Sequence, residues 1–143
     1  MKVGQISETK YLLRLERGEE VIATLTAFCE KHEIKNAWIT GLGSIDNPTL
    51  AHYKVDDKKY SEKQLSGVFE VTNFTGNIAL FEDKPLLHPH ITLGDEQMQA
   101  FSGHLVRGTV SATMEVMITV LPTTFTKSMS EEIGLKLFDL SEE

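Results

Sequence analysis

Apolar residues in this sequence recur with two different periods, and this contrast constrains the fold most. One group has helical spacing, at i, i+1, i+4, i+7 and i+8, which places it along one side of a helix. The group consists of Val21, Ile22, Leu25, Phe28 and Cys29. Glu19 and Glu20 are expected in the first turn, where the helix dipole favours negative charge. Elsewhere apolar and polar residues alternate, as in residues 11–15, which is typical of a half-buried strand.

Strand-like segments follow one another at short and fairly even spacing along the chain. After residues 11–15 they are residues 37–40, 49–55, 68–72, 77–81, 86–93, 101–106, 112–121 and 135–140. Turn-forming residues separate them, and we expect tight turns at residues 41–44 and 46–48. We therefore predict an α+β fold, with a mainly antiparallel sheet of about six to eight strands and one main helix packed on it.

Length and charge narrow the classes of function. The chain has 143 residues, so we expect residues 1–143 to form a single domain. Its 14 basic and 21 acidic side chains give a net charge of −7. A domain that holds nucleic acid through its phosphates normally carries a basic patch, whereas the longest basic cluster here is Lys58 and Lys59. Direct binding of nucleic acid is therefore disfavoured.

Hydropathy and cysteine content bear on the compartment. No apolar run approaches the roughly 20 residues that span a bilayer, and residues 1–5 lead into no apolar signal segment. The single cysteine, Cys29, excludes an internal disulfide. Its core position in the predicted helix favours an inert buried thiol over a nucleophile. We expect a cytoplasmic protein with no membrane contact.

Three of the five histidines form the most informative motif. His88 and His90 are two residues apart on a predicted strand, so their side chains point to the same face. If the strands on either side of a turn at residues 94–97 pair as a hairpin, His104 comes alongside them. Three neutral imidazoles suit a zinc ion and leave its fourth position for water or a small-molecule ligand. Nickel, iron or copper tolerates similar nitrogen ligands.

The spacing of these histidines leaves a second interpretation open. A His-x-His pair alone is a weak signal, and surface or hydrogen-bonded histidines would explain it as well. Pro89 lies between the two and has no backbone N–H, so its strand is either at an edge or bulged at this point. A bulge next to a site could re-aim one of the rings.

Two glutamates are candidates for acid–base chemistry. Glu70 lies in the strand-like segment 67–71, and Glu115 lies among apolar residues of segment 112–121. A carboxylate in such surroundings is expected to be partly buried and to need a partner. Either one could orient a histidine ligand, or act as general acid or base on a metal-bound water. A strand-edge glutamate paired with a lysine or arginine is an equally good explanation.

Motifs in order along nearly the whole chain resemble those of the plants-and-prokaryotes conserved (PPC) domain. They comprise residues 15–22, Gly41-Leu42-Gly43-Ser44, residues 67–71, His88-Pro89-His90, Gly103-His104-Leu105, Glu115 and a closing strand at residues 135–138. The resemblance implies an α+β fold, assembly as a homotrimer, and a three-histidine metal site formed by His88, His90 and His104. The family usually has two glycines before the last histidine, and here Ser102 replaces the first.

The resemblance to this family also raises the question of DNA binding. Plant members of the family have an AT-hook, an Arg-Gly-Arg segment that enters the minor groove of DNA, and prokaryotic members are often labelled DNA-binding on that basis. This sequence contains no Arg-Gly-Arg, so that part of the resemblance does not transfer.

The sequence also resembles, more distantly, acetolactate decarboxylase and a related zinc-dependent ester hydrolase, which share the fold and use three histidines on strands. By that resemblance Glu70 or Glu115 would be the proton-transfer candidate.

Three hypotheses about function follow. The first is a trimeric, metal-binding PPC-type module with a regulatory or scaffolding role. The second is a small zinc-dependent hydrolase or lyase that uses the open position on the ion. The third is a DNA-binding protein, which the net charge disfavours. The first two differ in whether a carboxylate lies within hydrogen-bond reach of a metal-bound water.

Overall fold

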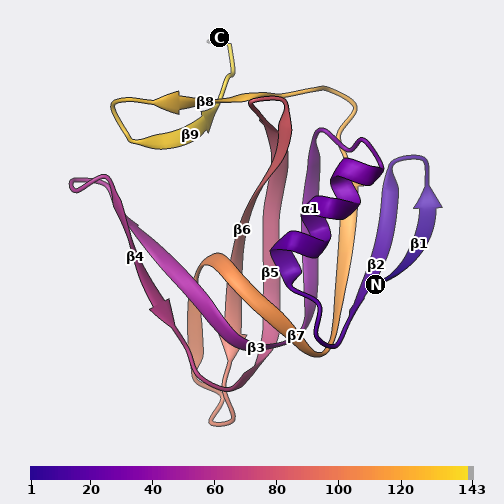
Figure 1. Ribbon diagram of the computed structural model, residues 1–143, viewed down its shortest axis with the longest axis vertical. Helices are drawn as coiled ribbons and strands as arrows, with labels where there is room; N and C mark the ends of the chain where they lie inside the picture. The colour runs from indigo at the N-terminus through magenta and orange to yellow at the C-terminus, as the bar shows by residue number, and fades with distance from the viewer. Residues whose placement is uncertain (142–143) are drawn as a thin grey trace.

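The backbone forms one helix and nine strands over residues 1–141, the part of the chain that the computed structural model describes (Figure 1). In chain order the elements are β1 Lys2–Ser7, β2 Lys10–Glu16, α1 Val21–Lys31, β3 Ala37–Lys54, β4 Lys59–Gln64, β5 Val68–Phe81, β6 Lys84–Gly94, β7 Ala100–Val120, β8 Lys127–Ser130 and β9 Leu135–Phe138. The predicted α+β class is confirmed. Within these residues, no helix has the length and apolar character needed to cross a membrane.

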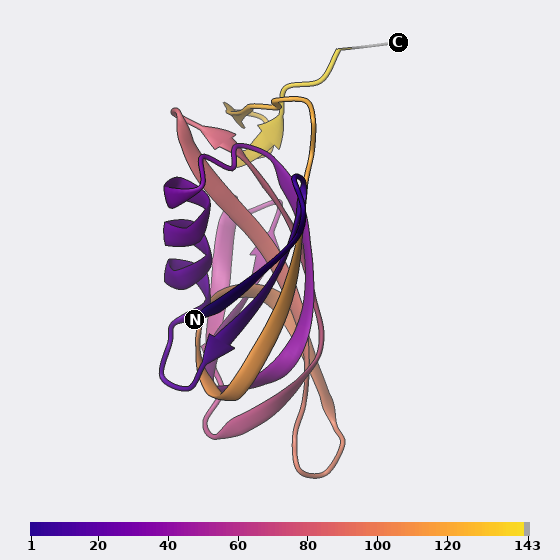
Figure 2. The same cartoon turned by 90° about the vertical axis from the view of Figure 1, so that its right-hand side faces the viewer.

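Seven strands form one antiparallel sheet, in the order β1-β2-β7-β6-β5-β3-β4. β3 also pairs with β7 along most of its length, from Ala37 opposite Val120 to Ala51 opposite His104. Because β7, β6, β5 and β3 are already neighbours in that order, this extra pairing closes the sheet on itself. The sheet is strongly curved and has an inner and an outer face (Figure 2). β8 and β9 form a separate antiparallel pair.

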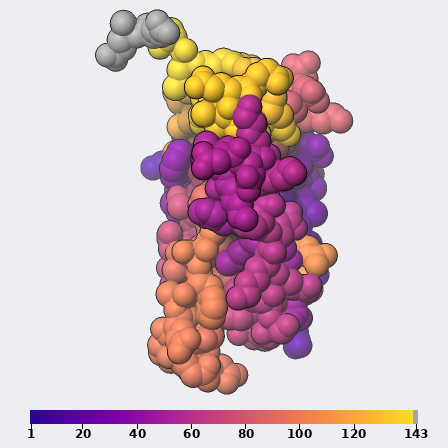
Figure 3. Space-filling view, turned by 90° about the vertical axis from the view of Figure 1, so that its left-hand side faces the viewer, coloured from indigo at the N-terminus to yellow at the C-terminus, as the bar shows by residue number. Residues whose placement is uncertain are grey.

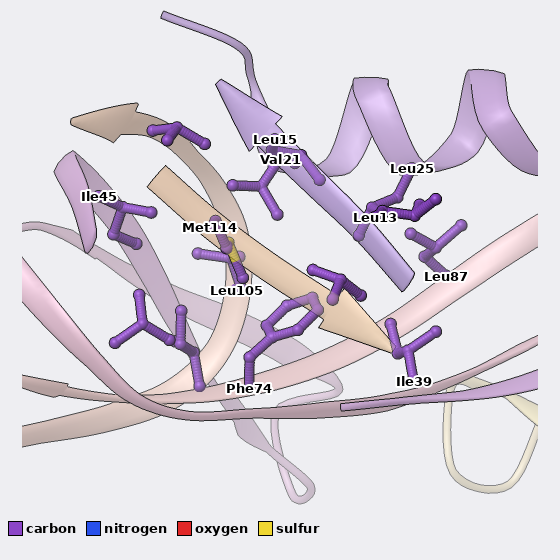
Figure 4. Packing of buried hydrophobic residues seen from close by; sticks show 14 of the residues in the cluster. Leu13, Leu15, Val21, Leu25, Ile39, Ile45, Phe74, Leu87, Leu105 and Met114 are labelled. Carbon is purple, nitrogen blue, oxygen red and sulfur yellow. The ribbon is translucent and has the colours of Figure 1, made fainter. Parts of the chain in front are cut away.

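The inner face of the curved sheet holds the core, and α1 packs over it against β6 and β7. Side chains alternate between the two faces along each strand. On β7, Met114 and Val116 are fully buried, whereas Glu115 between them is exposed. Figure 4 shows Leu25 of the helix beside Leu13 of β2. Each fully buried leucine stabilises the fold by about 1.5–3 kcal/mol through its removal from water.

The helix begins immediately after the two acidic residues that precede it. Glu20 is the N-cap, and its carboxylate accepts a hydrogen bond from the backbone N–H of Ala23 at 2.6 Å. Its other oxygen accepts from the backbone N–H of Gly108 on β7 at 3.1 Å. The prediction that Glu19 and Glu20 lie inside the first turn is therefore wrong. At the cap position, a carboxylate can satisfy an N–H group that has no partner within the helix.

Two predicted turns are bends inside a strand rather than chain reversals. β3 runs unbroken through residues 41–44 and 46–48, with shifts in register on both sides of Gly43. β5 likewise joins two predicted strands into one, with an irregularity just after Val71. Glycines and irregular pairing allow a long strand to bend around a core. Turn-forming residues in this chain therefore mark curvature as well as strand ends.

The β8–β9 hairpin is fixed to the sheet by hydrogen bonds to backbone groups. The buried Asn36 donates from its side-chain amide to the carbonyl of Phe125 at 2.9 Å and accepts from the N–H of the same residue at 2.8 Å. The hydroxyl of Tyr53 on β3 donates to the carbonyl of Ile133 at 2.6 Å. The tip of the β3–β4 hairpin, in magenta, therefore lies against the yellow C-terminal hairpin (Figure 3).

Replacing Gly76 by alanine is expected to destabilise the fold. Gly76 of β5 lies opposite Pro89, and a Cβ there would come within 2.5 Å of the carbonyl oxygen of His88. Because this neighbour is backbone, β5 and β6 would have to separate, and we expect a loss of about 1–3 kcal/mol of unfolding free energy in chemical denaturation. Gly4→Ala is the control, since its Cβ would meet one atom at an ordinary 3.7 Å. An equal loss in both variants would contradict the steric explanation.

Candidate metal centre

The three predicted histidines lie together on two neighbouring strands. His90 of β6 is directly opposite His104 of β7, which confirms the predicted hairpin. The ring centroids are 5.2 Å apart for His88 and His90, 5.4 Å for His88 and His104, and 5.6 Å for His90 and His104. One nitrogen of each ring lies within 4.8 Å of the others. The structure thus brings together side chains that are up to 16 residues apart in the sequence.

The alternation of β6 directs both of its histidines away from the core. Leu87, Pro89 and Ile91 are buried on the inner face, whereas His88 and His90 between them are exposed on the outer face. The β6–β7 ladder begins at His90, so the part of β6 that contains Pro89 pairs with β5 alone. Of the two predicted alternatives for Pro89, an edge or a bulge, the pairing fits the edge.

Two hollows in the outer face meet at the histidines. The first, which we call the histidine cleft, has a volume of about 540 Å³ and is bounded by β3, β4, β5, β6, β7 and β9. One of its walls is aromatic, since the ring centroid of Tyr60 on β4 lies 5.6 Å from that of His104 and 4.9 Å from that of Tyr53. Figure 3 shows the surface sunk between β4 in magenta and the orange strand β7.

The second hollow, which we call the leucine pocket, has a volume of about 380 Å³. It extends from His88 and His104 to the C-terminal hairpin. Its lining residues are Tyr60, Leu86, Leu87, His88, His104, Lys127, Met129, Gly134, Leu135, Lys136 and Leu137. An apolar pocket thus opens directly onto the candidate metal ligands.

The surroundings hold His88 and His104 in the neutral form that binds metals. His88 remains partly exposed, yet loss of hydration, the charge of Lys127 and the two neighbouring rings lower its pKa to about 4. Burial and the nearby His90 also lower the pKa of His104, while the carboxylate of Glu62 acts in the opposite direction. Because imidazole coordinates a metal only when deprotonated, the lone pairs of His88 and His104 are available at neutral pH.

The residues present fit a transition-metal ion. The Nδ1 atom of His104 is buried and has no hydrogen-bond partner among residues 1–141, and a buried polar atom without a partner is unusual and costly. Zinc–nitrogen bonds of about 2.0–2.1 Å place two ligands of one ion within about 4 Å of each other. Starting from nitrogens within 4.8 Å, small rotations of the rings bring all three to one ion.

Sequence reasoning missed Lys127, which lies on β8 and lines the leucine pocket. Its side chain is buried, which lowers the pKa of the ammonium group, and Nζ donates to Oδ1 of Asn77 at 2.9 Å. Asn77 of β5 lies directly opposite His88. Lysine in a short strand is ordinarily exposed, and nothing near it in the sequence signals a site, so only the fold identifies this residue.

The two predicted glutamates lie elsewhere on the outer face. Glu70 is opposite Gly94, four residues along β6 from His90, a separation of about 13 Å along the strand. Glu115 is opposite Arg14 of β2. Neither lines the histidine cleft or the leucine pocket. The expected partial burial of these carboxylates is wrong, because both are exposed on the face that α1 does not cover. Their catalytic role stays a prediction.

A third carboxylate, which the sequence analysis did not single out, lies in line with His90 and His104 across neighbouring strands. Glu62 of β4 is opposite Ala51 of β3, and Ala51 is opposite His104. Glu62 and His104 therefore project from the same face two strands apart, about 10 Å between backbones. β4 is exposed along its whole length and shows no apolar alternation, so no pattern in residues 59–64 predicts a strand.

Comparison with known proteins relates the chain to a domain family and to solved structures. Residues 4–122 match the Plants and Prokaryotes Conserved (PCC) domain, abbreviated PPC above. A "putative DNA binding protein" from Bacteroides thetaiotaomicron has a TM-score of 0.93 at 28% identity, covering 96% of each chain. A PPC protein from Pyrococcus horikoshii has a TM-score of 0.87 at 29% identity, covering 99% of this chain and 96% of that one. No curated protein matches the sequence.

Two further solved structures bear on the predicted resemblances. A metal-containing protein from Archaeoglobus fulgidus has a TM-score of 0.84 at 26% identity, covering 96% of this chain and 94% of that one. A Staphylococcus aureus protein of unknown function, described as similar to alpha-acetolactate decarboxylase, has a TM-score of 0.58 at 14% identity. The match covers 88% of this chain and 56% of that protein. That likeness confirms the distant resemblance for the fold alone.

The family match and the site coincide in the sequence. The segment that matches contains His88, His90 and His104 together with all the strands of the curved sheet except the first residues of β1. This chain belongs to the Plants and Prokaryotes Conserved domain family.

Proposed function

We propose that this protein is a metal-binding PPC-domain protein in which His88, His90 and His104 hold a divalent transition-metal ion, with zinc as the first choice. The observation that carries the proposal is the convergence of three imidazole nitrogens within 4.8 Å. The buried Nδ1 of His104, which has no partner among the described residues, supports it. So does the metal-containing relative from Archaeoglobus fulgidus.

A small-molecule ligand at the ion is part of the proposal. Zinc held by three histidines is a Lewis acid with an open fourth position. The histidine cleft gives a small molecule access to that position, and Tyr53 and Tyr60 offer it an aromatic wall. Binding of such a ligand would suit the regulatory or scaffolding role expected for a PPC-type module.

The alternative is a small zinc-dependent hydrolase or lyase, and the open cleft beside the histidines is the observation that favours it. Such an enzyme needs a proton-transfer group within hydrogen-bond reach of the metal-bound water. Glu70 and Glu115 are the candidates for that role, yet within one copy of the chain neither lines the cleft. The geometry therefore supports metal and ligand binding more strongly than catalysis.

We also propose that the chain assembles as a homotrimer through its outer face. Three large apolar side chains are exposed there, Leu12 at 44%, Trp38 at 50% and Leu42 at 56%. Leu12 is on β2, and Trp38 and Leu42 are on β3; β7 pairs with both strands, so the three side chains lie near one another. An exposed apolar patch of this kind marks a contact with another protein. Trp38 of β3 is opposite Asn77 of β5, and Asn77 is opposite His88 of β6. The proposed contact between subunits therefore borders the metal centre.

Direct binding of DNA is not part of the proposal. The net charge of −7 opposes approach to a polyanion, and the sequence has no Arg-Gly-Arg segment. The DNA-binding description of the Bacteroides thetaiotaomicron relative is therefore not carried over to this chain.

Removing one ligand should abolish metal binding. We expect the tag-free protein to retain about one zinc ion per chain after dialysis, and His104→Ala to retain less than about a tenth of that, because the remaining imidazoles cannot complete the site. Zinc at a hundredfold its Kd should raise the unfolding free energy of the wild-type protein by about 2.7 kcal/mol. His52→Ala, at an exposed histidine on the wall of the same cleft, is the control. Equal zinc content in both variants, measured by plasma mass spectrometry, would refute the ligand assignment.

The metal-free protein should lose stability as the pH falls. Unfolded His88 takes up a proton near its ordinary pKa of 6.5, whereas the folded ring does so at about 4. Between these values the unfolded state binds more protons, so the contribution of His88 is fully present above pH 6.5 and is lost toward pH 4. Thermal unfolding in a chelator should show this slope, and His88→Asn should flatten it. Identical slopes in the two proteins would contradict the prediction.

A charged residue in the exposed apolar patch should dissociate the proposed trimer. Light scattering should give the mass of three 16.0 kDa chains for the wild-type protein and that of one chain for Trp38→Lys, because burying an unpaired ammonium at an interface is costly. Met98→Lys, at a residue 87% exposed in the β6–β7 turn, is the control and should stay trimeric. A monomeric wild-type protein at micromolar concentration would overturn the proposal.

A further inference from the structure

Lys127 is a buried cation that has no anionic partner within the described part of the chain. It is 6% exposed, and among residues 1–141 it is the one charged side chain that belongs to the buried set. Its ammonium donates to Oδ1 of Asn77 at 2.9 Å and lies 4.5 Å from the centre of the Phe138 ring. Every ion pair within the described residues involves other groups.

This arrangement leaves the charge of Lys127 only partly compensated. A lysine ammonium has three N–H donors, and Asn77 accepts one of them. Removing a cation from water is costly unless an opposite charge accompanies it. A lysine whose role was only to pack would be replaced at less cost by a methionine of similar shape. The missing element is therefore a negative charge that residues 1–141 of this copy do not supply.

The surroundings of Lys127 indicate the size and polarity of that anion. Lys127 lines the leucine pocket, whose volume is about 380 Å³. Leu86, Leu135 and Leu137 supply apolar walls to this pocket, and His88 and His104 lie at its other end. The pocket thus offers a cation, an apolar lining and two of the proposed metal ligands to one small molecule.

We propose that the leucine pocket binds a small monocarboxylic acid with an apolar body. The carboxylate pairs with the ammonium of Lys127 and reaches toward the proposed metal ion, and the hydrocarbon part lies against the three leucines. The contact with the ion depends on the proposed function, whereas the contact with Lys127 does not. This assigns both a ligand class and a role to a residue that lies outside the three-histidine motif.

A carboxylate side chain from a neighbouring copy of the chain is the competing source of the negative charge. Two observations favour the small acid. Lys127 is nearly inaccessible from the surface, and it lies in a pocket of the volume of a small ligand. The two sources differ in their effect on assembly, since a partner's carboxylate would make the trimer depend on Lys127.

The test is calorimetric titration of the zinc-loaded protein with hexanoate. We expect binding to the wild-type protein, at least tenfold weaker binding to Lys127→Met, and at least tenfold weaker binding of hexanamide, which has the same shape without the charge. Lys84→Met is the control, because this lysine is exposed at the start of β6 and lines neither the leucine pocket nor the histidine cleft. It should change hexanoate binding less than twofold. Lys127→Met should fold with undiminished stability, since it removes a buried charge.

Each result decides between the alternatives. Equal binding of hexanoate to the wild-type protein and Lys127→Met, or no binding to either, overturns the proposal. A shift of Lys127→Met from trimer to monomer in light scattering, with hexanoate binding unchanged, overturns it in favour of a partner's carboxylate. If the wild-type protein retains no zinc, the proposed function fails by itself, and the same titration of metal-free protein decides the role of Lys127. Binding that requires Lys127 then upholds the anion site, and its absence overturns it.

Discussion

The pairing of β3 with β7 determines what the rest of the structure can be. It joins two segments that are distant in the sequence and turns an open sheet into a closed one, so that β3, β5, β6 and β7 each have an enclosed face and an exposed face. Ordering so long a loop costs chain entropy, which the burial of the apolar core offsets. The histidines of β6 alternate with core residues, and a one-residue slip would bury them and expose Leu87 and Ile91. The strand register that packs the core therefore also exposes the histidines.

The metal centre owes its geometry to strands rather than to loops. His90 and His104 are placed by a ladder whose register the core fixes, and His88 follows from the period of the same strand. The elements that partly desolvate the rings come from elsewhere, namely Tyr60 of β4 and Lys127 of β8. A ligand set held by rigid strands is preorganised, so little ordering is needed when an ion binds. Desolvation by the surrounding elements then lowers the pKa of His88 and of His104.

The parts of this structure that the sequence could predict are those with a local period. The helix and the two histidines of β6 follow from spacings of a few residues, and His104 follows from a short hairpin. The bends of β3 were predicted as turns because glycine marks curvature and reversal alike. β1 and β4 have no buried residues and hence no alternation to detect. For Glu115, apolar neighbours in the sequence indicated burial, although they face the opposite side of the sheet. Lys127 depends on a tertiary contact with no local signature.

The C-terminal hairpin occupies a particular position with respect to the conserved domain. The family match ends at residue 122, whereas β8 and β9 span Lys127–Ser130 and Leu135–Phe138. The nitrogen donors thus lie within the segment that matches the family, while Lys127 and Leu135, which line the adjoining pocket, lie beyond the end of that segment. A substitution in this hairpin can therefore alter the shape and charge of the pocket while leaving the three nitrogen donors in place.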